Sequence, residues 1–280
     1  VIDNFTIENG SASSGGAVYC KNSSPSIINC VFSDNAATGG YPYGDGGAIC
    51  CVSSDPKIVN CTFSGNRSEY AGGAIYCDNS SPTIINCVFV GNSAPYSCGG
   101  AIRSEGASIV ALTNCLFTGN SAYLGGAIHC YYGGALITNC TFSGNSASGD
   151  GGAIYCCYHS SSTLNNCILW GNSASRDGDE IHIDDSSCSC TMSHCCADST
   201  GYSGHTGRIV ENNCIHQDPQ FVDAANGDYH LKDTSPCIDA GSSLWVPSDA
   251  DRDLDGNQRI VDGNNDGTAA VDIGAYEYQP

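Results

Sequence analysis

Three residues that could act together on an acidic sugar recur at one position of a short repeated sequence. Arg103, His129 and Tyr155 each stand four residues after the first glycine of a Gly-Gly-Ala-Ile unit. If the units stack as strands, these side chains lie about 5 Å apart on neighbouring strands. An arginine could neutralise a uronate while histidine and tyrosine serve as base and acid, which suits β-elimination of an acidic polysaccharide.

The simpler interpretation is that outward positions of a strand must carry some residue, and that these three are ordinary there. The charge of the chain favours this simpler interpretation. It has 9 basic and 29 acidic side chains, and its formal net charge is −20. Such a chain repels nucleic acids, anionic membrane surfaces and acidic polysaccharides. A glycoside hydrolase acting on neutral sugars is compatible with this charge, but its two carboxylates cannot be identified from the sequence.

A second candidate for chemistry is an aspartate-rich stretch near the C-terminal end. Its carboxylates alternate before Gly256 and recur around Gly263, at Asp249, Asp251, Asp253, Asp255, Asp262 and Asp266. Carboxylates alternating before a glycine supply the oxygen ligands that calcium loops use. No Glu occupies the twelfth position, so this is not an EF-hand, and the alternative is a solvated acidic loop. Ca²⁺ is the one cofactor that the sequence suggests.

An internal repeat positions these residues. Gly-Gly-Ala followed by an aliphatic residue begins at Gly15, Gly46, Gly72, Gly99, Gly125 and Gly151, mostly 26 residues apart. Each unit holds short β-rich runs joined by Gly, Asn and Ser turns, without a helix signal. Because such runs cannot bury an apolar face alone, each must pair in parallel with its equivalent in the next unit. The sequence predicts an all-β fold, a right-handed parallel β-helix of about seven to eight coils.

Cysteines form two columns in this repeat. One column stands five residues after the first glycine, at Cys20, Cys51, Cys77, Cys130 and Cys156, with Ser104 in the remaining coil. The other column is Cys30, Cys61, Cys87, Cys115, Cys140 and Cys167. Equivalent residues of neighbouring coils lie about 4.8 Å apart, which a disulfide can span, so pairing along the stack and pairing within a coil both stay open. Thiolate metal clusters are the alternative, disfavoured because no Cys-x2-Cys pair occurs.

Asparagines precede the second cysteine column and form a column of their own. Its members are Asn29, Asn60, Asn86, Asn114, Asn139 and Asn166. Stacked side-chain amides can hydrogen-bond to one another and to the turn backbone, and Asn tolerates the left-handed conformation. The sequence therefore predicts an asparagine ladder at a bend between two strands.

The pairing of Gly-Gly-Ala-Ile with Phe-x-x-Asn resembles the repeat of the chlamydial polymorphic outer membrane proteins and of related bacterial and archaeal β-helix surface proteins. The matching runs are Phe32 to Asn35, Phe63 to Asn66, Phe89 to Asn92, Phe117 to Asn120 and Phe142 to Asn145. The resemblance covers roughly the first two thirds of the chain. It implies an architecture and not an activity.

Composition divides the chain into two parts. We expect the repeats to occupy residues 1–200 and an irregular, Asp-rich capping region to occupy residues 201–280. Within the second part, Asp218-Pro219-Gln220-Phe221 and Asp272-Ile273-Gly274-Ala275 resemble a C-terminal region of secreted bacterial β-helix proteins with varied anchors. That resemblance implies a surface-associated setting.

We expect a secreted or cell-surface protein with a structural or adhesive role and no membrane insertion. An oxidising compartment agrees with the 20 cysteines. Val1 to Ile7 already alternates like a coil strand without a cap, so its edges could accept a second copy and build a disulfide-stabilised fibre. The alternatives are a carbohydrate-active enzyme, as a polysaccharide lyase or glycoside hydrolase, and a module that binds glycans without turnover. Loop tyrosines that could stack on sugars are Tyr41, Tyr43, Tyr70, Tyr96 and Tyr123.

Overall fold

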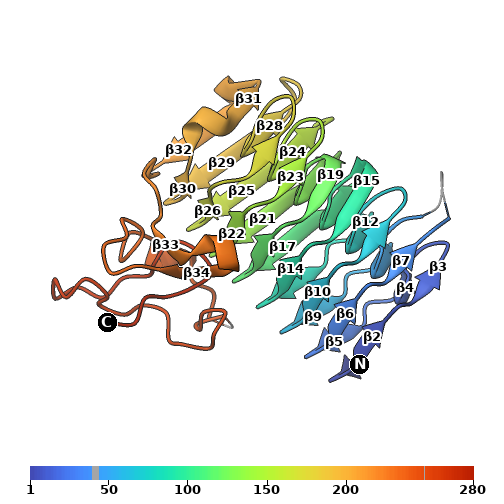
Figure 1. Cartoon of the computed structure of the whole chain (residues 1–280), viewed down its shortest axis with the longest axis horizontal. Helices are drawn as coiled ribbons and strands as arrows, with labels where there is room; N and C mark the ends of the chain where they lie inside the picture. Colours follow the sequence, from blue (N-terminus) through green and yellow to red (C-terminus); the bar gives the residue numbers. More distant parts are fainter. Residues whose placement is uncertain (40–43, 249) are drawn as a thin grey trace.

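The computed structural model describes residues 1–39, 44–248 and 250–280 as a parallel β-solenoid with a smaller region beside it (Figure 1). The chain passes through short strands that each pair with their equivalents one coil away, and these build four sheets, named A to D in chain order. The sheets hold nine, eight, seven and eight strands. The all-β parallel solenoid that the repeat predicts is confirmed.

The strands are short, and most have two to five residues. Sheet A contains β1 (Ile2–Asp3), β5 (Ser26–Ile28), β9 (Lys57–Val59), β13 (Thr83–Ile85), β17 (Ile109–Thr113), β21 (Gly134–Thr138), β25 (Ser161–Asn165), β29 (Ser189–Ser193) and β32 (Ile209–Asn212). Sheet B contains β2 (Thr6–Glu8), β6 (Val31–Ser33), β10 (Thr62–Ser64), β14 (Val88–Val90), β18 (Leu116–Thr118), β22 (Thr141–Ser143), β26 (Ile168–Leu169) and β30 (Cys196–Ala197). Sheet C contains β3 (Ser11–Ala12), β7 (Ala36–Ala37), β11 (Arg67–Ser68), β15 (Ser93–Cys98), β19 (Ser121–Leu124), β23 (Ser146–Ala147) and β27 (Ser173–Ala174). Sheet D contains β4 (Val18–Lys21), β8 (Ile49–Val52), β12 (Ile75–Asp78), β16 (Ile102–Glu105), β20 (Ile128–Tyr131), β24 (Ile154–Cys157), β28 (Ile181–Ile183) and β31 (Tyr202–Gly204).

The Gly-Gly pair makes the sharp entry into sheet D. Gly72 has a φ of +65°, which favours glycine. Gly73 lies so close to the next coil that a Cβ atom there would stand 2.0 Å from the carbonyl oxygen of Gly100. The repeat therefore keeps two glycines at this corner for two different reasons.

Columns of identical residues fill the core. The rings of Phe32, Phe63, Phe89, Phe117 and Phe142 stack with centroids 4.6 to 5.0 Å apart. Leu169 continues this column, because it pairs in register with Phe142. Isoleucines and both cysteine columns fill the rest of the interior, and all of these side chains are buried. Each coil thus buries its apolar face against its neighbours.

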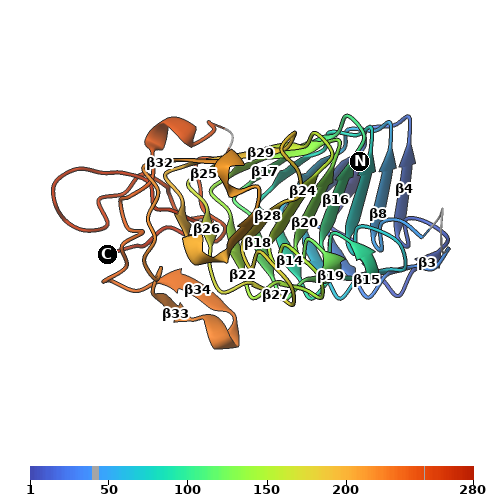
Figure 2. The same ribbon diagram turned by 90° about the horizontal axis from the view of Figure 1, so that it is seen from above.

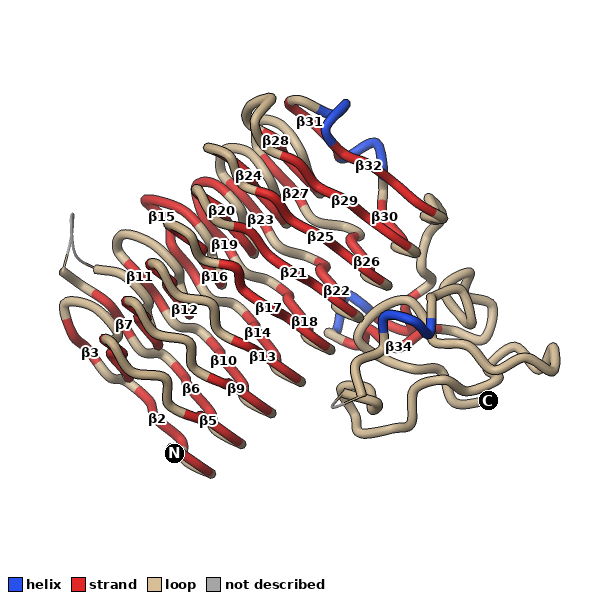
Figure 3. The backbone as a smooth tube through the Cα atoms, turned by 180° about the vertical axis from the view of Figure 1, so that it is seen from behind, coloured by secondary structure: helices blue, strands red, loops and turns tan. Residues whose placement is uncertain are grey.

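After Asn212 the chain leaves the solenoid and folds back beside sheet B (Figures 1 and 2). This region contains one antiparallel hairpin, β33 (Phe221–Asp223) with β34 (Asp228–Leu231). Its apolar side chains pack on outward residues of sheet B such as Leu116 and Ile168. The 3-10 turns η1 (Ser199–Gly201), η2 (Thr206–Arg208), η3 (Ala224–Asn226) and η4 (Ser243–Trp245) complete the regular structure (Figure 3). Among the described residues, no helix has the length and apolarity needed to cross a membrane.

Candidate functional site

The three residues of the candidate catalytic column lie side by side on sheet D, where Figure 2 shows β16, β20 and β24 in succession. Arg103 pairs in register with His129, and His129 with Tyr155. The rings of His129 and Tyr155 stack with centroids 5.2 Å apart, and His182 stacks on Tyr155 at 5.0 Å. The structure therefore brings the predicted residues together on three successive coils.

These outward side chains are nevertheless buried. His129 is 2% exposed, whereas Tyr19 at the equivalent position of the first coil is 52% exposed. Tyr70 of one connection from sheet C to sheet D and the ends of the longer strands β15 and β19 lie beside the middle of sheet D, and the space they enclose is a cavity of about 370 Å³. We call this cavity the tyrosine pocket. Its walls are Tyr70, Ser97, Cys98, Arg103, Leu124, His129, Tyr131, Tyr155, Cys157, Tyr158 and Asp184.

Arg103 is already paired within the protein. Its Nη2 atom lies 2.9 Å from Oε2 of Glu105, and its guanidinium lies over the rings of Tyr70 and Tyr131 at 5.6 and 5.5 Å. Burial opposes its charge, but Glu105 and other neighbouring groups more than offset this, so the pKa of Arg103 is raised. Its Nε atom has no hydrogen-bond partner among the described residues. Glu105 thus neutralises the positive charge of Arg103, and one buried N–H donor stays without a partner.

The histidine and tyrosine of the column are poor acid–base groups. Burial, assisted by the charge of Arg103, holds the pKa of His129 well below its usual range, so its imidazole is neutral. Its Nδ1 atom has no partner among the described residues. Burial also raises the pKa of Tyr155, whose hydroxyl donates to Asp184 at 2.8 Å. The pocket offers hydrogen bonds and aromatic faces more readily than proton transfer.

An exposed aromatic cluster adjoins the pocket, and nothing in the sequence analysis identified it. Tyr131, Tyr132 and Tyr158 form it, with ring centroids 4.8 to 5.6 Å apart, and His159 lies 5.9 Å from Tyr132. Tyr132 and Tyr158 are about half exposed.

Tyr132 and Tyr158 also have left-handed backbone, with φ of +55° and +51°. The equivalent residues of earlier coils are Asn22, Ser53, Asn79 and Gly106. Bulky residues are rare in this conformation and cost roughly 1–2 kcal/mol each there. A departure from the repeat at a left-handed position was the signal that could have revealed the cluster.

Of the other loop tyrosines, Tyr70, Tyr96 and Tyr123 each contact a different part of the molecule. Tyr70 lines the pocket. Tyr96 lies under the guanidinium of Arg67 at 5.5 Å, and the hydroxyl of Tyr123 accepts a hydrogen bond from Arg176. Tyr41 and Tyr43 lie outside the described residues.

The aspartates of the C-terminal region mostly accept hydrogen bonds from backbone amides of the same region. Asp253 accepts from the amides of Asp255, Asn257 and Glu277 at 2.7 to 3.0 Å. Asp262 accepts from the amides of Asp266 and Gly267 at 3.0 Å. Asp251 accepts through its carbonyl from the amide of Arg259.

The carboxylate of Asp255 lies 2.6 Å from Nε2 of His230, and Asp249 lies outside the described residues. Within the described ranges, no three His, Cys, Asp or Glu side chains gather where they could hold a metal ion. Calcium binding stays a prediction.

The expected asparagine column lies at the bend between sheets A and B. Each of its members has φ between +51° and +53°. Side-chain amides link Asn60 to Asn29, Asn86 to Asn60, Asn114 to Asn86 and Asn166 to Asn139, at 3.0 to 3.3 Å. No bond joins Asn139 to Asn114, because Nδ2 of Asn139 and Oδ1 of Asn114 have no partner among the described residues. The side-chain amide of Asn114 donates to Asn86 and also to the carbonyl of Arg252 at 2.6 Å. Ser242 likewise exchanges two hydrogen bonds with the side chain of Asn166, so the C-terminal region docks onto two rungs of this column.

A second asparagine ladder lies fully inside the protein, between sheets B and C. Its members are Asn35, Asn66, Asn92, Asn120, Asn145 and Asn172. Each side-chain amide donates to the side-chain oxygen of the next asparagine at 2.8 to 3.0 Å, and the last donates to Glu180. Burial raises the pKa of Glu180 to about 7, although hydrogen bonds from Asn172 oppose this. The sequence marked these asparagines as turn residues and missed the ladder.

The cysteines of both columns point into the core as thiols. In the second column, Cys61 donates to the carbonyl of Val59 and accepts from the amide of Cys30, with sulfur at 3.2 and 3.4 Å. All 20 cysteines are unbonded in the structure. The thiols of the second column therefore have local backbone partners, and disulfide pairing stays a prediction.

Comparison with known families agrees with this geometry. A model described as a right-handed β-helix region matches residues 1–136. A model described as the Chlamydia polymorphic membrane protein repeat matches residues 139–157. A search of curated proteins finds no match.

Proposed function

Because the chain is a β-helix repeat protein with repeats like those of the polymorphic membrane proteins, we propose that it acts at the cell surface as an adhesin that binds glycans. The repeat match supports surface association. The tyrosine pocket and the aromatic cluster beside it support the binding role.

The observation that carries this proposal is the pair of strained tyrosines. Tyr132 and Tyr158 stand where other coils have Asn, Ser or Gly, and their left-handed backbone is unfavourable for tyrosine. Strained residues persist mainly where the surroundings enforce them, and they cluster at ligand sites. Their exposed rings offer flat apolar faces with polar hydroxyls, which suits sugar rings.

The charges of the pocket favour an uncharged glycan. The one guanidinium, that of Arg103, is paired with Glu105, and the whole chain carries a net charge of −20. An acidic sugar would therefore meet repulsion without a free cation to offset it. The unpartnered Nε of Arg103 and Nδ1 of His129 are buried, so the tyrosine hydroxyls of the pocket wall are the groups that can bond neutral sugar hydroxyls.

Substituting each strained tyrosine by the repeat's own residue tests the proposal. Tyr132→Asn and Tyr158→Asn should keep or raise the melting temperature, since Asn tolerates a positive φ better. Binding to neutral glycans, first found on a glycan array, should weaken at least about tenfold, equal to roughly 1.4 kcal/mol.

Tyr19→Asn is the matched control, because Tyr19 is exposed on sheet D outside the pocket. Unchanged affinity in both cluster variants would contradict the proposal. Cleavage products that disappear in an Arg103→Gln variant would instead favour a carbohydrate-active enzyme.

A second candidate role is end-to-end self-association. β1, β2, β3 and β4 each pair on one side only, and an unpaired strand edge accepts further strands. We propose that a second copy adds there, and that neighbouring column thiols oxidise by exchange with a soluble disulfide and stabilise the fibre. Negative-stain microscopy should reveal filaments, and thiol titration of the unfolded chain should find fewer than 20 thiols. Discrete monomers at high concentration would rule out the fibre.

A further inference from the structure

Trp170 departs from the repeat, and part of its ring packs against the apolar cluster between sheet B and the C-terminal region. Trp170 follows the phenylalanine column in sheet B, where the earlier coils have Glu8, Ser33, Ser64, Val90, Thr118 and Ser143. Five of the six earlier coils therefore fill this outward position with Ser, Thr or Val, and none of the six has an aromatic residue there. Trp170 is only partly buried, so its ring offers apolar surface to solvent.

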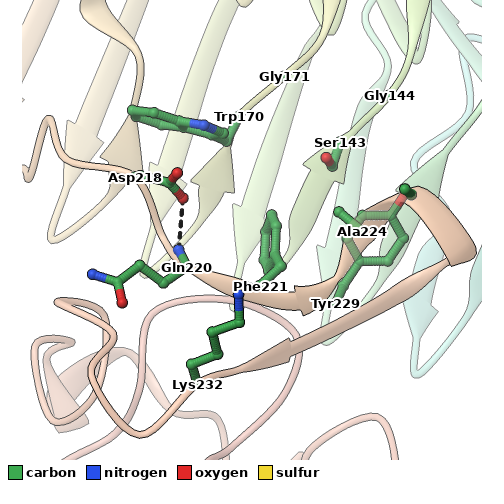
Figure 4. Close-up of a pocket in the computed structure, with 11 residues that line it drawn as sticks. Ser143, Gly144, Trp170, Gly171, Asp218, Gln220, Phe221, Ala224, Tyr229 and Lys232 are labelled. Carbon is green, nitrogen blue, oxygen red and sulfur yellow. Dashed lines mark hydrogen bonds between the residues drawn. The ribbon is translucent and has the colours of Figure 1, made fainter.

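The β33–β34 hairpin forms the opposite wall of a groove beside this ring. The hydroxyls of Tyr229 in β34 and Thr118 in β18 lie 2.6 Å apart and tie the hairpin to the solenoid. Phe221 packs edge-on against Tyr229 with centroids 5.3 Å apart. The space between Trp170 and the hairpin is a cavity of about 480 Å³, which we call the hairpin groove (Figure 4).

Polar groups face Trp170 across the groove. Figure 4 shows Asp218 and Gln220 on the hairpin side, with Lys232 beneath Phe221. Gln220 has a φ of +55°, and its backbone N–H donates to Asp218 at 2.7 Å. Its side-chain oxygen accepts from the hydroxyl of Thr234, which leaves the side-chain NH2 group as the donor for a ligand. Asp218 and Lys232 carry opposite charges, which leaves the groove without a net charge.

The floor of the groove is open. Gly144 and Gly171 lie there with φ of +68° and +73°. A Cβ atom on Gly171 would meet only Ser143 Oγ, at 3.8 Å. The backbone therefore leaves room for a ligand beside the indole.

We infer that the hairpin groove is a second sugar-binding site, which holds one uncharged pyranose ring against Trp170. The indole face stacks on the apolar face of the sugar ring. The side-chain amide of Gln220, the carboxylate of Asp218 and the ammonium of Lys232 form hydrogen bonds with the hydroxyls of the sugar. This site lies on sheet B and the tyrosine pocket on sheet D, so the inference does not depend on the proposed pocket.

Tryptophan fluorescence tests the inference, because the chain has only two tryptophans. In a Trp245→Phe variant all tryptophan emission comes from Trp170. This protein is titrated with methyl glycosides of glucose, galactose, mannose and N-acetylglucosamine. At least one should change the emission in a saturable way, and Gln220→Gly should raise its dissociation constant about tenfold or more.

The matched control is Trp170→Ser, which places the residue of three other coils at this position and leaves Trp245 as the reporter. It should fold and show no saturable change with the same glycosides. Tyr158→Asn should leave the Trp170 titration unchanged, so the outcome is independent of the tyrosine pocket. No saturable change with any of the four glycosides, or a change that survives Gln220→Gly at full affinity, would overturn the inference.

Discussion

At the scale of single residues, the buried asparagines form a continuous chain of side-chain hydrogen bonds through the solenoid. Asn92 donates to the carbonyl of Phe63 and to Asn120, and its oxygen accepts two bonds from Asn66. Asn92→Ala leaves these buried partners unsatisfied, so we expect a loss of about 3 kcal/mol in the free energy of unfolding. Urea unfolding measures it.

Asn60→Gly provides the comparison, because Asn60 is exposed and glycine accepts its positive φ. It should cost less than about 1 kcal/mol. Equal losses in the two variants would contradict the importance of burial.

Glu180 gives the internal ladder a pH dependence. Burial raises its folded pKa to about 7, above the usual value near 4.5. The folded state therefore binds more protons between these values, and stability should fall as pH rises from about 4.5 through about 7. In Glu180→Gln, the free energy of unfolding should decrease by about 1–3 kcal/mol less than in the parent protein over this pH range. Melting temperatures across this range measure the effect, and an unchanged slope in the variant would count against it.

At the scale of elements, the phenylalanine stack links the sheet B strands of neighbouring coils. Phe89→Ala opens a cavity in the middle of the stack and should cost about 3–5 kcal/mol in the free energy of unfolding. Phe89→Leu should cost about 1.5 kcal/mol or less, because Leu169 already occupies this column in a later coil. Chemical denaturation separates the two, and similar losses would show that ring stacking is not what stabilises this sheet.

The stacking of these elements could be predicted from the sequence, but the pocket could not. Six copies of Gly-Gly-Ala and five of Phe-x-x-Asn fix the register, since a one-residue slip would expose the phenylalanines. The burial of Arg103 instead depends on connections between sheets C and D that carry no repeat signal. The contact of Tyr229 with Thr118 joins residues that are 111 apart in the chain, and no local sequence pattern predicts it.

At the scale of the whole molecule, two proposed sugar sites on different sheets would make each chain bivalent. Beads coated with a glycan that binds both sites should then be agglutinated by the protein. Tyr158→Asn or Trp170→Ser alone should abolish agglutination while leaving binding at the other site measurable. Agglutination that survives in the double variant would show that bead cross-linking comes from elsewhere, such as self-association.

The asparagine ladders also constrain how such a protein can evolve in length. Each coil contributes one rung to each ladder, so a gene duplication preserves both only if it copies a whole unit. A copied unit would lengthen the rod by about 4.8 Å and leave the register of its neighbours intact. Changes in size are therefore expected to come in whole coils, while the connections from sheet C to sheet D diverge freely and alter what each coil presents.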